Sequence, residues 1–196
     1  MPRSVFTRLF LVMVLLVGGW APPALAQLFE TRAKQAYLID ADTGTVLFAK
    51  NEDEPVPPAS LAKLMTMEVV FNAIHTGRLT LDDTFQVSEN AWRTGGAISR
   101  TSTMFAELKS SIRLEDLIQG VIVQSANDGC IIIAEGMAGS EENFARLMTE
   151  RARAIGLTTS VFGNSNGLPH PDSKVTMKDL VTLAHHIQST YPEFYK

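Results

Sequence analysis

The stretch of sequence that decides the fold reads Pro57-Pro58-Ala59-Ser60-Leu61-Ala62-Lys63-Leu64-Met65-Thr66. The two prolines favour a helix start, because proline already holds the backbone angle that the first helical turn requires. Apolar residues then recur at helical spacing, and Gly77 supplies a C-terminal stop. The sequence therefore predicts a helix over 60–75 with Ser60 in its first turn.

Two polar residues of this helix, Ser60 and Lys63, form a Ser-x-x-Lys motif. Residues three apart share a helix face, so the lysine amine can reach the serine oxygen. A serine hydroxyl needs a base to become a nucleophile, and lysine is such a base only when burial or nearby positive charge keeps its amine neutral. The helix N-terminus offers free backbone N–H groups where an oxyanion would form. The motif alone leaves open a serine cap followed by a solvated lysine.

A second candidate element is Ser125-Ala126-Asn127, at a predicted junction between two helices, where side chains can turn into a cleft. Ser125 could pass a proton between Lys63 and a leaving amine, and Asn127 could hold a substrate amide. A second Ser-x-Asn begins at Ser88, which follows an extended segment and opens a predicted helix. Ser88 is therefore interpreted as a helix N-cap.

The chain order of predicted elements indicates a mixed α/β fold. Alternating apolar residues on either side of Asp42-Thr43-Gly44 predict a β-hairpin over 36–49. After the loop at 51–58 and the helix at 60–75, we expect an extended segment at 80–87, a short helix from Ser88 to about 94, helices at 114–124, 128–137 and 141–155, a strand at 158–162 and a last helix at 177–188. One strand pair beside a helical cluster leaves the sheet incomplete, so we expect the chain to stop before its domain does.

The first 26 residues have the features of a signal peptide. Arg3 and Arg8 precede an apolar run at 9–20, and Ala24-Leu25-Ala26 is a small-x-small cleavage pattern. The run is shorter than the roughly 20 apolar residues that a membrane-spanning helix needs. We therefore expect cleavage after Ala26 and export to the periplasm, with a retained membrane anchor as the alternative.

Composition and charge exclude several classes of function. The net charge of −4 and the lack of a dense basic run make nucleic acid an unsuitable partner. The four histidines form no metal-binding pattern, so we expect neither a metal site nor another cofactor. Cys130 is the only cysteine and stands beside an isoleucine run, which predicts a buried, inert thiol.

The segments at 58–66 and 125–128 together resemble the low-molecular-mass penicillin-binding proteins, the D-alanyl-D-alanine carboxypeptidases. The similarity covers essentially the whole chain after residue 26, and its combined motifs are far more specific than either catalytic triplet. The further matching segments are Leu38-Ile39-Asp40-Ala41-Asp42-Thr43-Gly44, Val87-Ser88-Glu89-Asn90-Ala91, Asn166-Gly167-Leu168 and Tyr191-Pro192-Glu193.

The resemblance implies a serine transpeptidase/β-lactamase-like fold, with a helical cluster beside a five-stranded antiparallel sheet. It implies that the terminal D-Ala-D-Ala of a peptidoglycan stem peptide acylates the serine, that D-alanine leaves and that water hydrolyses the ester. β-Lactam antibiotics would mimic the dipeptide and trap the acyl-enzyme. By position, Ser60 is the nucleophile, Lys63 the general base, Ser125 the proton relay and Asn127 the substrate-binding amide.

One departure from the family pattern concerns a third motif, Lys-Thr/Ser-Gly, which relatives carry on a strand facing the serine. Neither form occurs in this sequence. We therefore expect residues 27–196 to be the N-terminal portion of the peptidase domain, truncated before that strand. A C-terminal region through which many relatives associate with the membrane is also expected to lie outside this chain.

Three alternatives to the carboxypeptidase remain open. A class A β-lactamase shares Ser-x-x-Lys, but this sequence has no Glu-x-x-Leu-Asn to activate a deacylating water. A non-catalytic module that holds peptidoglycan or a β-lactam is favoured by the absent third motif. An exported domain with coincidental motifs is disfavoured by the number of segments that agree.

Overall fold

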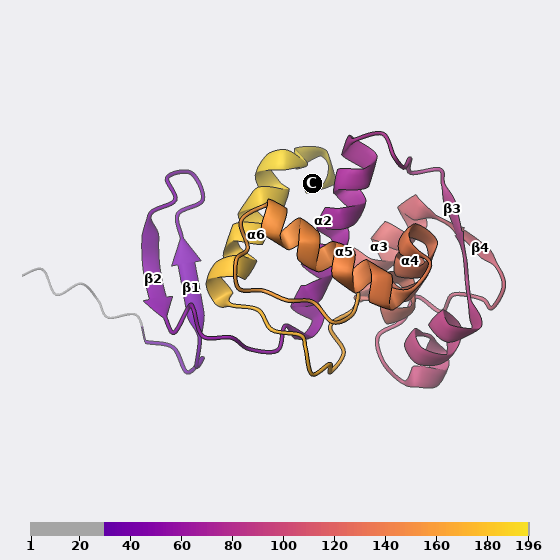
Figure 1. Cartoon of the computed structure of the whole chain (residues 1–196), viewed down its shortest axis with the longest axis horizontal. Coiled ribbons are helices and arrows are strands. Elements are labelled where there is room, and N and C mark those ends of the chain that lie inside the picture. The colour runs from indigo at the N-terminus through magenta and orange to yellow at the C-terminus, as the bar shows by residue number, and fades with distance from the viewer. Residues whose placement is uncertain (1–29, 196) are drawn as a thin grey trace, which may run out of the picture. The chain divides into compact units, whose positions relative to one another are not determined.

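The computed structural model describes residues 30–195, and the candidate signal peptide at 1–26 lies outside them. From Ala33 onward the described residues form one compact unit of helices and short antiparallel strands (Figure 1). This confirms the predicted mixed α/β class. Within the described part of the chain, no helix combines the length and the apolar character needed to cross a membrane.

The predicted hairpin is formed by β1 (Ala36–Ile39) and β2 (Val46–Lys50), which pair antiparallel. The carboxylate of Asp40 accepts hydrogen bonds from the backbone N–H and the hydroxyl of Thr43, at 2.8 and 2.7 Å. These bonds lower the pKa of the Asp40 carboxyl. Gly44 takes the positive φ of 69° that the turn requires. The Asp40 side chain and Gly44 together determine the position of the hairpin turn.

The central helix is α2 (Ala62–His75), preceded by one 3₁₀ turn, η1 (Ala59–Leu61). The predicted helix over 60–75 is therefore confirmed, with its first turn wound more tightly than an α-helix. Ten of the 14 residues of α2 are buried, because α5 and α6 pack against it. Burial on nearly all sides fixes the orientation of the residues at its N-terminal end.

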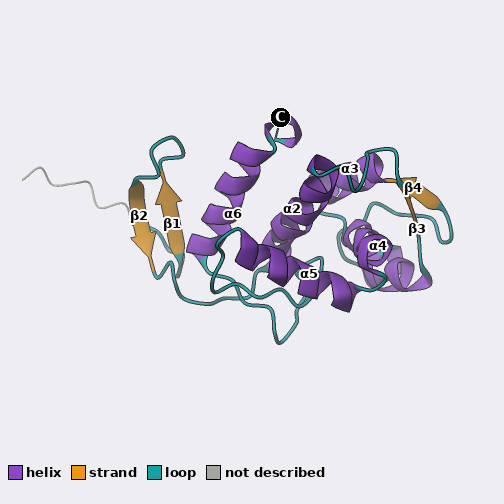
Figure 2. Ribbon diagram, turned by 45° about the horizontal axis from the view of Figure 1, so that its top comes forward, coloured by secondary structure: helices purple, strands orange, loops and turns teal. Residues whose placement is uncertain are grey.

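Within the described residues, four more α-helices follow α2 in the sequence (Figure 2). Two of them begin at side-chain caps, since Ser140 accepts from the amide of Asn143 and Thr176 accepts from the amide of Asp179, both at 3.1 Å. Their bounds agree with the predicted ranges to within two residues. These helices are α3 (Leu114–Gln124), α4 (Asn127–Ala138), α5 (Glu141–Ala154) and α6 (Met177–Thr190).

A second pair of strands, β3 (Thr84–Gln86) and β4 (Ser111–Arg113), is separate from the hairpin. The strands within residues 30–195 thus pair as two two-stranded sheets, and the five-stranded sheet that the resemblance implies is incomplete there. After β3, the hydroxyl of Ser88 accepts from the amide of Ala91 at 2.9 Å. The interpretation of Ser88 as a cap is confirmed.

The strand predicted at 158–162 is wrong. Only Val161 forms a β-bridge, to Lys174. The amides of the two residues before Val161 instead donate to the carboxylate of Asp179, at 3.1 and 2.8 Å. A side chain on α6 thus accepts the hydrogen bonds that these two backbone amides would otherwise donate to a neighbouring strand. The segment is therefore a loop and not a strand.

A buried polar cluster joins α2 to α5 and to the last helix. Glu68 is fully buried and accepts from the guanidinium of Arg151 at 2.8 Å and from the hydroxyl of Tyr191 at 3.1 Å. His186 Nε2 lies 3.3 Å from the same carboxylate. A buried charge that is fully partnered in this way fixes how its elements pack.

Candidate active site

Ser60 and Lys63 meet at the N-terminal end of α2, as their spacing predicts. Lys63 Nζ lies 3.1 Å from Ser60 Oγ, within hydrogen-bond distance. Ser60 is exposed in the middle of η1, whereas the Lys63 side chain is buried with 6% of its surface accessible. The nucleophile candidate therefore faces solvent, and its candidate base lies in the protein interior beside it.

Burial changes the acid–base character of Lys63. Loss of solvent lowers the pKa of the amine, since water no longer stabilises the ammonium form. Lys63 Nζ also lies 2.9 Å from the backbone carbonyl oxygen of Asn166, which accepts a hydrogen bond from it. The amine is thus desolvated and held at two points, which is the setting that a lysine base needs.

The loop that carries Asn166 is internally braced. The carboxamide of Asn164 accepts from the amide of Gly167 at 2.8 Å and donates to the carbonyl of Leu168 at 2.9 Å. From α2, the hydroxyl of Thr66 donates to the carbonyl of Ser165 at 2.6 Å. These bonds fix the carbonyl that contacts Lys63 relative to the helix on which Lys63 stands.

The backbone before Ser60 is strained, and backbone hydrogen bonds hold it in place. Ala59 adopts a positive φ of 47°, a region that residues with a β-carbon seldom occupy. Three residues earlier, Val56 exchanges two backbone hydrogen bonds of 2.9 Å with Val175. Strain of this kind persists only where the surrounding structure enforces it, and such positions cluster at functional sites.

Ser125 is brought to the same place as the first two residues. It follows the last residue of α3 and takes a positive φ of 54°, which ends that helix. Ser125, Ser60 and Lys63 line one cavity of about 230 Å³, together with apolar residues of α2 and α3. The structure therefore places these three side chains around one space; their roles as relay, nucleophile and base stay predictions.

Asn127 begins α4 and lines a larger cleft of about 650 Å³ that also reaches Ser60. Its amide N–H donates to the carbonyl of Ser102 at 2.8 Å. The residue is buried, with 4% of its surface accessible, yet its side-chain Oδ1 has no hydrogen-bond partner among the residues that the structure describes. A buried, unpaired acceptor is costly, so this oxygen is an exception among the buried polar groups beside the site; the substrate-binding role of Asn127 stays a prediction.

Asp128, the residue after Asn127, holds the loop beside the site. Its carboxylate is fully buried and accepts from the hydroxyl of Thr103 at 2.6 Å and from the amides of Met104 and Ala106 at 3.0 and 3.1 Å. One side chain on α4 thus fixes the loop at 101–106 against Asn127.

Cys130 is fully buried, as its surroundings predict. Burial raises the pKa of its thiol to about 12, so the sulfur stays protonated at neutral pH. Among the residues that the structure describes, no group of His, Cys, Asp and Glu side chains is arranged to hold a metal ion.

Comparison with known proteins identifies the family to which the chain belongs. The model of the peptidase S11 family, described as D-alanyl-D-alanine carboxypeptidase, matches residues 22–196. D-alanyl-D-alanine carboxypeptidase DacC of Escherichia coli is 38% identical over 164 residues, which are 83% of this chain and 41% of that protein. DacF of Bacillus subtilis is 32% identical and covers 95% of this chain and 48% of its own length. The chain thus spans less than half the length of these two curated relatives.

The fold agrees with the sequence comparison. The crystal structure of penicillin binding protein 6B from Escherichia coli superposes with a TM-score of 0.81 at 36% sequence identity, covering 88% of this chain and 55% of that one. The architecture is therefore that of the serine transpeptidase-like penicillin-binding proteins. On sequence and structure together, the chain belongs to peptidase family S11, the D-alanyl-D-alanine carboxypeptidases.

Proposed function

We propose that this protein is a serine-type carboxypeptidase that removes the terminal D-alanine from peptidoglycan stem peptides ending in D-Ala-D-Ala. The observation that carries the proposal is the buried amine of Lys63, 3.1 Å from the exposed hydroxyl of Ser60. A desolvated lysine amine within hydrogen-bond distance of a serine hydroxyl at a helix start is the arrangement that a serine nucleophile and its base require. Membership in the carboxypeptidase family supports the same reaction.

Acylation begins when Ser60 Oγ attacks the carbonyl carbon of the penultimate D-alanine. The serine proton passes to the neutral amine of Lys63, and Ser125 relays a proton to the nitrogen of the departing D-alanine as the C–N bond breaks. Asn127, which lines the same cleft as Ser60, binds a peptide group of the substrate and orients it. The product of this step is an ester on Ser60.

Water then attacks the ester, the proton again passes through the Lys63 amine, and the peptide leaves one residue shorter. A β-lactam presents a strained amide at the position of the D-Ala-D-Ala bond, so the same attack opens its ring. The leaving nitrogen stays tethered to the acyl group, which slows hydrolysis and leaves a lasting adduct on Ser60. A relative named for penicillin binding has the same fold.

The test is the intact mass of the purified protein after incubation with benzylpenicillin, beside a Ser60→Ala control. We expect one adduct on the wild type and none on the variant, together with D-alanine release from diacetyl-L-lysyl-D-alanyl-D-alanine. Labelling of the Ser60→Ala protein would overturn the assignment of the nucleophile. An adduct without D-alanine release would favour a binding module, and rapid loss of intact penicillin would favour a β-lactamase.

We also propose export to the periplasm, with cleavage after Ala26. The support is the positive segment, apolar run and small-x-small pattern at 1–26. N-terminal sequencing of protein recovered from the periplasm should begin at Gln27. Recovery of the uncleaved chain in the membrane fraction would instead indicate an anchor, and the same fractionation detects peripheral association with the membrane.

A further inference from the structure

Ser165, the residue before Asn166, is held through every polar group that it has. Its hydroxyl and its backbone amide donate to the carboxylate of Glu141, at 2.6 and 3.3 Å. Its backbone carbonyl accepts from the hydroxyl of Thr66 at 2.6 Å. The residue is fully buried, so these bonds are made away from water. Because Glu141 begins α5 and Thr66 stands on α2, one residue of the loop is fixed to two helices.

The position of Ser165 determines where the next carbonyl lies. Asn166 follows it directly, and the Asn166 carbonyl oxygen lies 2.9 Å from Lys63 Nζ. The side chain of Asn166 is used within the loop, since it accepts from the amide of Leu168 at 2.9 Å. Thr66 and Lys63 are three residues apart on α2 and so share a face of the helix. Two consecutive carbonyls of the loop therefore meet two side chains on one face of α2.

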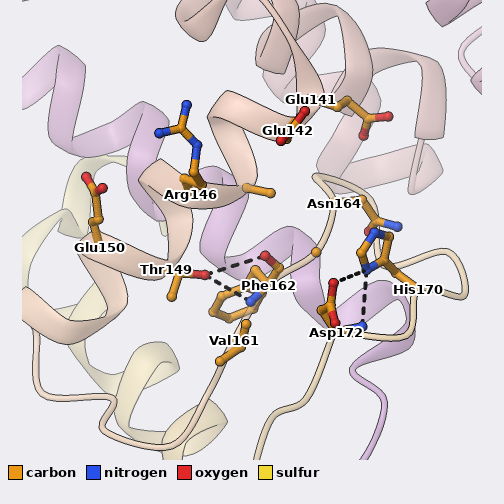
Figure 3. A pocket seen from close by; sticks show the side chains of 12 residues that line it. Glu141, Glu142, Arg146, Thr149, Glu150, Val161, Phe162, Asn164, His170 and Asp172 are labelled. Carbon is orange, nitrogen blue, oxygen red and sulfur yellow. Dashed lines mark hydrogen bonds and ion pairs between the residues drawn. The ribbon is translucent and has the colours of Figure 1, made fainter.

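The helix α5 contacts the same loop at a second point, which provides a comparison. In Figure 3, Glu141 and Thr149 come from α5, and Phe162 comes from the loop. The hydroxyl of Thr149 accepts from the amide of Phe162 at 3.1 Å. Both contacts join a side chain of one helix to the backbone of one loop, but only Glu141 holds the residue beside Asn166. Glu141 lines neither cavity that contains Ser60, so its effect on the reaction must pass through the loop.

We propose that Glu141 and Thr66 are positioning residues for the base. By holding Ser165 between α5 and α2, they place the Asn166 carbonyl that orients the Lys63 amine. The proposal rests on the proposed carboxypeptidase function, in which Lys63 takes the proton of the serine. A displacement of about 1 Å in a catalytic group can cost about 100-fold in rate, so a residue can act in this way without touching the substrate. Glu141 acts here as a hydrogen-bond acceptor, and its charge is not required.

The experiment measures acylation by benzylpenicillin in stopped flow and separates the acylation rate constant from the noncovalent dissociation constant. Glu141→Ala and Thr66→Val should each lower the rate constant about tenfold and leave the dissociation constant unchanged. Glu141→Gln keeps the acceptor oxygen and Thr66→Ser keeps the hydroxyl, so both should retain most of the rate. The control Thr149→Val removes the contact of α5 with Phe162. It should lower Tm by a similar amount without changing the rate constant.

The pH profile separates positioning from a general loss of structure. A carbonyl that accepts from the lysine stabilises its ammonium form, so displacing the Asn166 carbonyl should lower the pKa of Lys63. In Glu141→Ala the midpoint of the pH profile should therefore fall to a lower pH, together with the rate reached above it. A variant that is only less stable should keep the midpoint of the wild type.

Wild-type rate constants in both Glu141→Ala and Thr66→Val, or an equal loss of rate in Thr149→Val, would overturn the proposal. If the wild type forms no adduct, the carboxypeptidase function fails, and titration of Lys63 still decides the positioning. Nuclear magnetic resonance of carbon-13-labelled lysine follows this titration, with the Lys63 signal assigned by its absence from Lys63→Arg. A lower midpoint in Glu141→Ala than in the wild type would support the positioning role, and an equal or higher midpoint would reject it.

Discussion

Gly167 lies directly against the residue before the nucleophile, so that a β-carbon at Gly167 would overlap the backbone carbonyl oxygen of Ala59. Gly167 also has a positive φ of 79°. The strained backbone of Ala59 is thus in direct contact with Gly167, for which a positive φ carries no strain. The closeness of this contact holds Ala59 in the conformation that exposes the Ser60 hydroxyl.

Gly167→Ala should therefore cost more than the usual replacement of a glycine at positive φ. We expect a loss of about 2–4 kcal/mol in the free energy of unfolding, because the new methyl group must displace backbone. Gly139→Ala is the matched control, since Gly139 has a φ of 77° with open space around it, and should lose only about 1 kcal/mol. Urea unfolding of both variants measures the difference. Similar losses would show that the contact with Ala59 is unimportant.

The lowered pKa of Lys63 predicts how acylation depends on pH. As the pH rises, the neutral amine becomes more abundant, so the rate of penicillin acylation should rise with a midpoint below the value of about 10.4 for an exposed lysine. Lys63→Arg, which cannot lose its proton, should abolish the rise. Stopped-flow acylation between pH 6 and 9 tests this. A normal rate in Lys63→Arg would remove lysine as the base.

The same shift has a consequence for stability. The unfolded chain binds the Lys63 proton up to a higher pH than the folded chain does, so this residue destabilises the fold at low pH. Its penalty should diminish as the pH rises from the lowered pKa to the ordinary lysine value. The stability gained by Lys63→Met should therefore be larger at pH 7 than at pH 10, as measured by urea unfolding. A gain independent of pH would contradict a depressed pKa.

The two Ser-x-Asn patterns should respond differently to removal of their hydroxyl groups. Ser125→Ala should lower the acylation rate about 100-fold with a small effect on stability, because Ser125 faces the cavity of Ser60 and Lys63. Ser88→Ala should instead cost about 1 kcal/mol of stability through the lost cap and leave acylation unchanged. Acylation rates and thermal unfolding of both variants distinguish the roles. An unaffected rate in Ser125→Ala would exclude it as the relay.

Asp128→Asn should destabilise the protein by about 2–4 kcal/mol. The new amide group would face N–H donors that now bind a carboxylate, and a buried unpaired donor is costly. Asp116→Asn, at an exposed position of α3, should have little effect. Hydrogen exchange should also show faster opening of the loop at 101–106 in Asp128→Asn. Unchanged protection there would mean that other contacts hold the loop.

Local patterns in the sequence predicted most of the elements. The hairpin and the helices follow from side-chain periodicity and from turn and cap residues, which act within a few positions. The prediction of a strand at 158–162 was wrong because two of its amides donate to the carboxylate of Asp179, about 20 residues away. No local sequence pattern indicates such a contact. A contact distant in sequence overrode the local preference.

In the candidate site, too, local spacing predicted some contacts, whereas contacts between residues distant in sequence could not be predicted. The spacing of Ser60 and Lys63 predicted their contact, since both lie at one helix start. The contact between Asn166 and Lys63 could not be predicted from residue spacing. The group that contacts Lys63 is a backbone carbonyl, which every residue possesses. The positive φ of Ala59 was likewise hidden, since alanine rarely adopts it.

The carbonyl of Asn166 also sets the direction in which the lysine can act. A carbonyl oxygen can only accept, so one N–H of Lys63 points at Asn166 whether the amine is charged or neutral. When the third proton is lost, the lone pair is left free to turn toward Ser60 Oγ. The hydrogen bond between the two side chains then reverses, with serine as donor. A loop more than a hundred residues away in sequence thereby sets the polarity of the first proton transfer.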